Sequence, residues 1–389
     1  MGDYRKVSRR KFIKGASAGF VLGMGGLYNK NTQKGEKPII SMKKISKISI
    51  SKKLIRNARI VLEVSCCAKA GESLLIIRDE VLLPYAPALA SAAIELGLIP
   101  TIMDITHFLL TDSYQNGFVL KPLKEAIESS DIVIQNLADT WVKNRPDFGR
   151  LVGDPDLHDK SLSGERRWMI IQCNGIEEWE IAPEEVLKIR IRTEWLLNLL
   201  KSSKTGRITS SLGTDFTFGL GPNSNLSPIL GIIPFYGEIA VTPSLENTSG
   251  TFIVDGPTQL DVRPANELDR KPLMITVKDG RVKDVIGDKV QLKRLREFIA
   301  SGVPPADAID EVGILTTILE ENDKYYWSDG THHHDRIHIA LGNNVRRDTV
   351  VHGLKHMDCE VCKPTISIDG LIVIENGIFK DEVLKRTGK

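Results

Sequence analysis

The feature that most constrains the fold is a change of pattern near residue 203. From residue 53 to about residue 200, segments with the apolar spacing of helices alternate with short apolar runs typical of buried strands. The predicted strands are residues 73–77, 99–104, 131–136 and 168–173, and the predicted helices are residues 54–68, 84–96, 120–129 and 183–201. Alternation of this kind predicts a parallel sheet that helices cover on both faces.

Beyond residue 204, strands punctuated by glycine dominate the pattern. They are predicted over residues 207–211, 215–218, 237–241, 251–255 and 274–277, and they resume after a helix over residues 289–301. Asp279-Gly280 predicts a tight hairpin turn. We therefore predict an α/β fold in which an α/β domain with a parallel sheet, residues 46–203, precedes a β-rich α+β metal-binding domain, residues 204–389. No glycine-rich phosphate loop follows a strand of the first domain, which argues against a dinucleotide site.

The first 45 residues form a basic head. They contain 11 Lys and Arg against 2 Asp and Glu, which leaves 41 basic and 48 acidic residues in the remainder. A remainder without a basic excess argues against nucleic acid as a partner. The run from Ser8 to Lys14, with Arg9-Arg10 followed by Phe12, precedes a mildly apolar stretch and indicates a twin-arginine export signal. The alternative is a basic amphipathic tail.

Export by this signal predicts the twin-arginine translocation machinery as a partner and a periplasmic or other extracytoplasmic location. No clear cleavage site with small residues follows the apolar stretch, so an uncleaved signal would tether the protein to the membrane.

Two imidazoles and a carboxylate lie close together in the sequence near its end. His338 belongs to a predicted strand, and His356 and Asp358 follow after a short loop. Neutral imidazole nitrogens and carboxylate oxygens bind zinc, iron, manganese or cobalt, and three protein ligands leave positions open for water or substrate. These residues predict a metal-dependent enzyme.

Several segments carry a resemblance to a known family. They are the segments 237–243, 250–256, 311–313, 338–342 and 356–370, which contain Gly-Glu, Glu-Val-Gly, His-Ile-Ala-Leu-Gly and His-x-Asp. Together they resemble the aminopeptidase T family of metallopeptidases, whose scaffold a dihydroxypyridine ring-cleaving dioxygenase shares. The resemblance covers roughly residues 50–380 and leaves the export signal outside.

The peptidase resemblance implies two divalent ions (zinc, cobalt or manganese), a small peptide substrate and a homo-oligomeric assembly. The implied metal ligands, carried over position by position, are Glu238, Glu311, His338, His356 and Asp358. A bridging water would lose a proton and attack the peptide carbonyl, with Glu311 as either an anionic bridge or the general base. The chain departs from the family at Val345, where a tyrosine is expected.

Two other functions remain open from the sequence. In a ring-cleaving dioxygenase, His338, His356 and Asp358 would hold one Fe(II), and Glu238 and Glu311 would be structural. In an exported binding protein without turnover, the metal would be structural, although closed structural zinc sites usually contain cysteine.

The remaining metal-binding residue types have simpler interpretations. His332-His333-His334 is typical of a solvated loop or a weak opportunistic metal binder, because three consecutive side chains cannot all face one ion; a role in substrate gating is the alternative. If residues 356–368 form a strand, His356, Asp358, Glu360 and Cys362 share one face and Cys359 lies on the other. A joint metal or redox role for Cys359 and Cys362 would therefore need a bend in the strand.

Overall fold

The computed structural model describes residues 50–79, 84–106, 108, 120–137, 167–171, 179–230, 234–256, 272–301, 306–318, 332–342 and 356–385. These residues all belong to one compact unit, Ser49–Lys389. The predicted export signal and its linker lie outside the described residues, and so does Val345. Within the described ranges, no helix has both the length and the apolarity needed to cross a membrane.

The first half of this unit is built on a four-stranded parallel sheet. Its strands, in the order β2-β1-β3-β4, are β2 Ile99–Asp104, β1 Ser73–Arg78, β3 Ile132–Asn136 and β4 Arg167–Ile170. Its helical segments are α2 Lys52–Ile60, the π-helical turn η1 Val61–Ser65, α3 Tyr85–Glu95 and α6 Lys121–Glu128. Alternate residues of β1 point to two separate clusters, one shared with α2 and α3 and the other with α6. The prediction of a parallel sheet with helices on both faces is confirmed.

The second half consists of two antiparallel sheets. The eight-stranded sheet has the order β11-β10-β9-β6-β5-β15-β16-β17. Its strands are β5 Thr205–Thr209, β6 Asp215–Gly219, β9 Ser244–Val254, β10 Leu273–Lys278, β11 Arg281–Ile286, β15 Thr365–Ile368, β16 Leu371–Glu375 and β17 Ile378–Phe379. Asp279 and Gly280 join β10 to β11 with φ angles of 51° and 67°, as the predicted hairpin turn requires.

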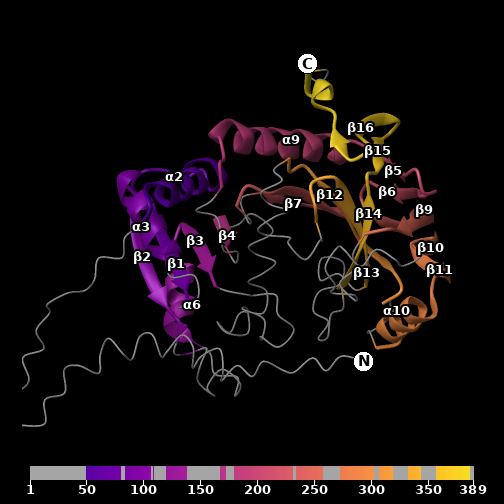
Figure 1. The fold of residues 1–389 in the computed structure, drawn as a ribbon, viewed down its shortest axis with the longest axis horizontal. Helices are drawn as coiled ribbons and strands as arrows, with labels where there is room; N and C mark the ends of the chain where they lie inside the picture. The colour runs from indigo at the N-terminus through magenta and orange to yellow at the C-terminus, as the bar shows by residue number, and fades with distance from the viewer. Residues whose placement is uncertain are drawn as a thin grey trace, which may run out of the picture. The chain divides into compact units, whose positions relative to one another are not determined.

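The five-stranded sheet has the order β14-β13-β12-β8-β7. Its strands are β7 Asn225–Leu230, β8 Gly237–Thr242, β12 Ile309–Leu315, β13 Arg336–Gly342 and β14 His356–Cys362. The remaining elements are α9 Pro183–Lys201, α10 Lys289–Ser301 and the 3₁₀ turn η3 Asp381–Lys385. In Figure 1 the sheet appears in red-brown to yellow, below α9.

Helix α9 contributes to the cores of both halves. Val186 and Ile189, near its start, pack in a cluster with β1 and β3, whereas Leu196 and Leu200, near its end, pack with the antiparallel sheets. Figure 1 shows the helix extending between these two parts of the unit. The domain boundary near residue 203 stays a prediction.

One face of the five-stranded sheet forms the core against the eight-stranded sheet. The side chains on this face are all apolar or cysteine and belong to one buried cluster: Ile239, Val241, Val312, Ile314, Ile337, Ile339, Leu341, Met357, Cys359 and Val361. Because side chains alternate along a strand, the intervening residues lie on the opposite face. That opposite face carries the polar residues described below.

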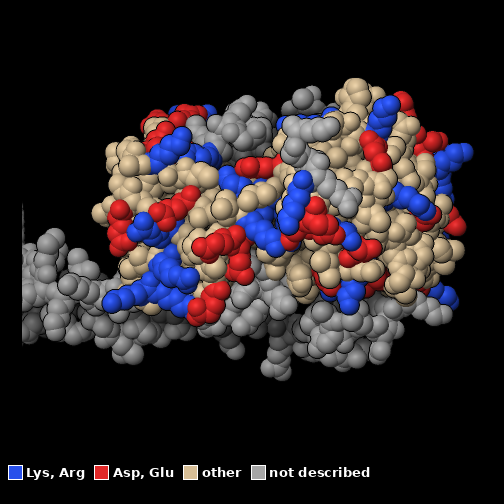
Figure 2. Space-filling model, turned by 90° about the horizontal axis from the view of Figure 1, so that it is seen from above, with Lys and Arg blue, Asp and Glu red and all other residues tan. Residues whose placement is uncertain are grey.

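Charged side chains of both signs cover the surface. On the face drawn in Figure 2, Lys and Arg side chains of the described residues are interspersed with Asp and Glu. Ion pairs on the surface join residues four apart along the chain or on neighbouring strands, such as Arg59 with Glu63 and Arg207 with Asp215. Exposed pairs of this kind contribute little to stability, because water and salt screen them.

Candidate metal centre

The five predicted ligands lie on the polar face of the five-stranded sheet. The register pairs Leu315 with Glu238, Gly313 with His338, and His338 in turn with Glu360. Glu311 and Asp358 flank Ala340 one step further along the same face. All of the predicted ligands except His356 are at most 7% exposed, whereas the side chain of His356 is 37% exposed.

Gly313 makes room for the His338 imidazole. A Cβ atom at position 313 would lie 2.0 Å from both Cε1 and Nε2 of His338. The ring therefore occupies the space above β12 that a side chain would otherwise fill. Ala240 and Ala340, the neighbours on the same face, are also small and fully buried. Small residues at these positions create a recess into which the larger polar side chains extend.

Three of the predicted ligands form one tight group. Nε2 of His338 lies 3.3 Å from Oε1 of Glu311 and 3.5 Å from Oε1 of Glu238. The hydroxyl of Tyr236 donates to the other oxygen of Glu238 at 2.5 Å, and it orients this carboxylate. Glu238, Glu311 and His338 offer three ligand atoms within 4.8 Å of one another, which is one of the two groups of this kind among the described residues.

His356 and Asp358 form a separate pair of ligand residues. Glu311 lies next to this pair as well as next to His338. Nε2 of His356 lies 2.8 Å from Oδ1 of Asp358 and 4.0 Å from Oε2 of Glu311. The two carboxylate oxygens of Glu311 thus face different imidazoles, with Oε1 toward His338 and Oε2 toward His356. Glu311 therefore lies between His338 on one side and the His356–Asp358 pair on the other.

A β-bulge in β12 explains how two consecutive acidic residues serve the same centre. Ile309 pairs with Leu341 and Glu311 pairs with Ala340, so Asp310 is the extra residue between them. Regular alternation would place Asp310 and Glu311 on opposite faces. Instead, Oδ2 of Asp310 lies 2.8 Å from Nδ1 of His356 and fixes the orientation of that ring.

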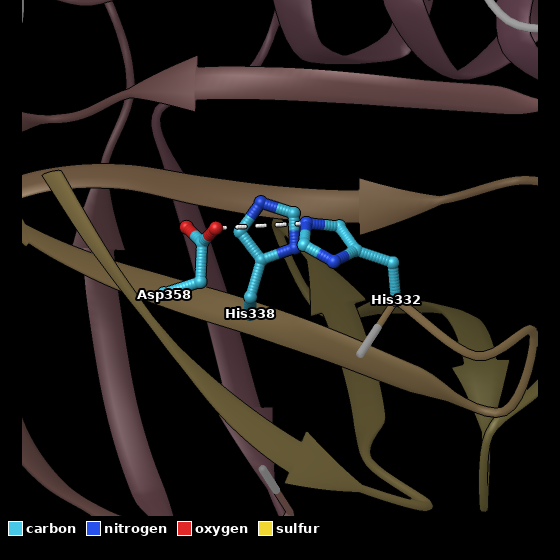
Figure 3. A group of neighbouring side chains, drawn as sticks. All are labelled: His332, His338 and Asp358. Carbon is cyan, nitrogen blue, oxygen red and sulfur yellow. Dashed lines mark ion pairs between the residues drawn. The ribbon is translucent and has the colours of Figure 1, made fainter. Parts of the chain in front are cut away.

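Two further residues of the centre were not predicted as ligands. His332, expected in a solvated loop, is only 12% exposed at its side chain, and its Nε2 lies 3.6 Å from Oδ2 of Asp358. Its ring packs against the His338 ring, with 4.5 Å between the ring centroids. Figure 3 shows the two rings next to each other, with Asp358 nearby. Glu360 is fully buried beneath it and accepts a hydrogen bond from the His332 backbone N–H at 3.0 Å. The shared parity of His356, Asp358 and Glu360 on β14 was the only sequence signal for Glu360.

The charges of the centre strongly perturb its titration. Burial raises the pKa of Glu238 to about 7 and that of Glu360 to about 8, although the His338 imidazole lowers both. Burial opposes the charged form of His338, but Glu238 and Asp358 outweigh it and raise its pKa to about 10. Burial likewise opposes ionisation of Asp358, but His356 and His338 hold its pKa well below the ordinary range. Each ionised group here depends on an opposite charge nearby.

The arrangement fits a bound cation. Two ligand atoms that are each about 2.1 Å from one ion lie roughly 3.0–3.4 Å apart for octahedral or tetrahedral angles. The distances from His338 Nε2 to the two glutamates, 3.3 and 3.5 Å, are close to this range. Oε1 of Glu238 and Oε2 of Glu360 are buried and accept no hydrogen bond. Buried carboxylates are stable when they are paired or bind a metal, so a divalent cation would compensate this cluster.

The cysteines of β14 take no joint part in the centre. Cys359 belongs to the apolar core cluster, and Cys362 lies at the end of the strand with its backbone N–H bound to Asp255. Both are free thiols. The strand is regular here, as its unbroken pairing with β13 shows, so the bend that a shared site would require does not occur.

Comparison with known proteins places this geometry on a known fold. No protein-family model matches the sequence, and no curated protein sequence matches it. Among the solved structures with a similar fold, two each cover 84% of this chain. One is 2,5-dihydroxypyridine dioxygenase from Pseudomonas putida KT2440, with a TM-score of 0.58 and 15% identity over 84% of this chain and 96% of the other. The chain shares the fold of this dioxygenase.

The second structure is AmpT from Thermus thermophilus, with a TM-score of 0.54 and 13% identity over 84% of this chain and 98% of the other. The resemblance inferred from the sequence is therefore confirmed at the level of the fold. At such low identity the fold alone follows, and the reaction has to be argued from the residues of this chain.

Proposed function

We propose that the chain is a metal-dependent hydrolase of the aminopeptidase type, with two divalent ions in the centre. The observation that carries the proposal is the position of Glu311, whose two oxygens face His338 and His356 separately. Two neighbouring cations repel each other and need an anion between them, and a carboxylate supplies one. Glu238 and His338 would complete one position, and His356 and Asp358 the other.

The bound metal would polarise a carbonyl group and activate water near neutral pH. The residues of the chain would supply the rest. Tyr236 holds the Glu238 carboxylate by its hydroxyl, and Asp310 holds His356 with Nε2 directed toward Glu311. His356 is the most exposed member of the centre, so substrate would approach from its side. Glu311 would act as the bridge, the proton acceptor for the attacking water, or both in turn.

A second candidate is a mononuclear Fe(II) oxygenase, because the structure contains a group of two histidines and one carboxylate. The group is His332, His338 and Asp358, whose ligand atoms lie within 4.8 Å of one another. It differs from the triad expected from the sequence, since His332 takes the place of His356. Two imidazoles and a carboxylate on one ion are typical of iron oxygenases that bind oxygen and a chelating aromatic substrate.

Metal analysis combined with two assays tests these functions. The purified protein would be stripped with a chelator, loaded separately with zinc, cobalt, manganese or ferrous iron, and analysed for ions per chain. Hydrolysis of aminoacyl amides with two ions per chain supports the hydrolase. Oxygen uptake with a dihydroxylated pyridine and one ferrous ion supports the oxygenase, and inertness toward both substrates would contradict both proposals.

The variant Glu311→Gln tests the bridge itself. We expect it to bind one ion where the wild type binds two, because a neutral amide no longer offsets the repulsion between cations. Glu246→Gln is the matched control, since Glu246 is exposed on β9. Two ions of unchanged affinity in Glu311→Gln would show that Glu311 is not the bridge.

We further propose that this enzyme is exported by the twin-arginine route, an inference that depends on Arg9-Arg10 and the residues around them. Cell fractionation of the wild type and of an Arg9→Lys, Arg10→Lys variant tests it. Export is expected only for the wild type, and equal export of both would exclude the route.

A further inference from the structure

Asp358 lies between two imidazoles. Its Oδ1 lies 2.8 Å from Nε2 of His356, and its Oδ2 lies 3.6 Å from Nε2 of His332. The two histidines come from different parts of the chain, His356 from the start of β14 and His332 from the loop before β13. Asp358 therefore presents one oxygen to each ring, and Figure 3 shows the side that faces His332.

Each of these imidazoles has a buried carboxylate near its second ring nitrogen. Oδ2 of Asp310 lies 2.8 Å from Nδ1 of His356, and Oε1 of Glu360 lies 3.6 Å from Nδ1 of His332. The same oxygen of Glu360 also accepts the His332 backbone N–H at 3.0 Å. Histidines that bind metals usually direct their second ring nitrogen at a carboxylate or carbonyl, which fixes the tautomer and the ring orientation. His356 has this arrangement with a hydrogen bond, and His332 has a looser version in which the carboxylate lies at an ion-pair distance.

The backbone around His332 is arranged to direct its ring inward. Its φ angle is +51°, a conformation that costs a residue other than glycine about 1 kcal/mol or more. The ring is packed against His338 at 4.5 Å, with an angle of 52° between the planes. The hydrogen bond from the Arg336 backbone N–H to the His333 carbonyl closes the turn that follows. His332 is thus held at the centre by contacts on several sides.

We propose that His332 is a metal ligand that binds, through Nε2, the divalent ion held by Asp358, and that Glu360 positions its ring. The proposal rests on the metal centre proposed above and adds a ligand to it. The separation of 3.6 Å between His332 Nε2 and Asp358 Oδ2 is close to the roughly 3.0–3.4 Å expected for two atoms that bind one ion. Glu360 is fully buried, and its Oε1 lies 3.6 Å from Nδ1 of His332, so it is placed to position that ring.

Cobalt-loaded protein allows the ligating histidines to be counted in the wild type. Each imidazole that binds Co²⁺ through Nε2 keeps a hydrogen on Nδ1, and the metal shifts its proton resonance far from the ordinary range. With histidine labelled by ¹⁵N, we expect three such resonances, from His332, His338 and His356. Three resonances in the wild type and one fewer in His332→Ala would support the inference.

Metal affinity provides the second measurement. His332→Ala should weaken the binding of one ion by more than about 10-fold, and Glu360→Gln by about 10-fold, since partners of ligating histidines typically contribute 10–100-fold. His333→Ala is the matched control, because it alters the same histidine run one residue away. It should retain the affinity and all three resonances.

The outcomes separate this inference from the proposed function. If the wild type binds two ions and His332→Ala keeps both affinities and every shifted resonance, the inference is overturned and the hydrolase proposal stands. A change in KM alone, with metal binding intact, also overturns it and makes His332 a substrate contact. If the wild type binds no divalent ion, both proposals fail. Should His332→Ala not fold, two resonances instead of three in the wild type would be decisive against the inference.

Discussion

The two faces of the five-stranded sheet are built from alternate residues of the same strands, yet they differ in almost every property. Between Ile337 and Leu341, β13 places every second side chain in an apolar core. The intervening His338 meets two glutamates, with only Gly313 beneath its ring. The core face is stabilised by burial of apolar area. The polar face is a buried cluster of ionisable groups, which a bound cation would compensate.

This difference shows that one strand can serve stability and chemistry independently. A change on the core face should alter the free energy of unfolding and leave the metal centre intact in the folded molecules. A change on the polar face should alter metal binding first. If the two faces are independent, no substitution confined to the core face should change the metal affinity of the folded protein.

The largest effect is expected for Asp358→Ala. The variant loses a carboxylate that faces both His356 and His332, so metal binding at that position should disappear and turnover should fall by at least about 1,000-fold. Metal content per chain and the rate under saturating substrate measure the two effects. Asp284→Ala, at an exposed position of β11, is the control. An unchanged metal content in Asp358→Ala would contradict the ligand assignment.

A large loss of stability is expected for Ile339→Ala, directly next to His338 but on the core face. Removing this fully buried side chain should lower the free energy of unfolding by about 2–5 kcal/mol. Denaturant titration measures the loss, and Ile286→Ala, at a position 58% exposed, should change little. Metal affinity of the folded Ile339→Ala protein should match the wild type. A lowered affinity would show that the two faces are coupled.

Gly313→Ala and Gly206→Ala form a matched pair of substitutions, and their expected loss of stability is smaller than that of Ile339→Ala. A Cβ atom would lie 2.0 Å from the His338 ring at Gly313, and 2.0 Å from the Phe218 ring at Gly206. Both alanine variants should lose about 1–3 kcal/mol through overpacking. Only Gly313→Ala should also weaken metal binding, by about 10-fold or more, because the His338 ring that it would displace is a proposed ligand. Equal metal affinity in the two variants would remove the distinction.

The smallest effect is a pH dependence confined to the polar face. The pKa of His338, raised to about 10, means that its stabilising contribution is complete below its unfolded pKa of about 6.5 and is lost as the pH rises toward 10. The raised pKa values of Glu238 and Glu360, about 7 and 8, act in the same direction, because burial favours their protonated forms. The low pKa of Asp358 affects stability only in strong acid.

The metal-free protein should therefore show a Tm that falls between pH 6 and pH 9. Adding zinc should raise the Tm by an amount that grows with pH, since imidazoles bind metal in their deprotonated form. Differential scanning calorimetry of both forms measures this difference. A Tm of the metal-free form that rises over the same range would argue against the charges assigned to the centre.

The sequence was most informative where the pattern is regular. The helical and apolar runs before residue 203 predicted the parallel sheet, and period-two alternation on β14 predicted that His356, Asp358 and Glu360 share one face. The five predicted ligands lie together on one face of the sheet. Strand β7 was missed because Pro228 interrupts its pattern, and proline is tolerated there because β7 is the edge of its sheet.

The missed members of the centre depend on irregular geometry. His332 reaches Asp358 through a left-handed residue in a run of three histidines that looks like a polar loop. Asp310 joins His356 only because β12 contains an extra residue, and Tyr236 reaches Glu238 from just outside β8. No sequence period encodes a single turn or a bulge, so these contacts became visible only in three dimensions.

The bulge in β12 also affects how this chain can be aligned with distant relatives. Before it the odd-numbered Ile309 faces the core, and after it the even-numbered Val312 and Ile314 do. If an alignment places its gap one position away from Asp310, residues of the polar face will be aligned with core residues of the other protein along the strand. At 13–15% identity, alignments of this region should therefore be anchored on both sides of the bulge, at Ile309 and at Gly313. In this strand, the number of residues between Ile309 and Gly313 decides which side chains face the centre and which face the core.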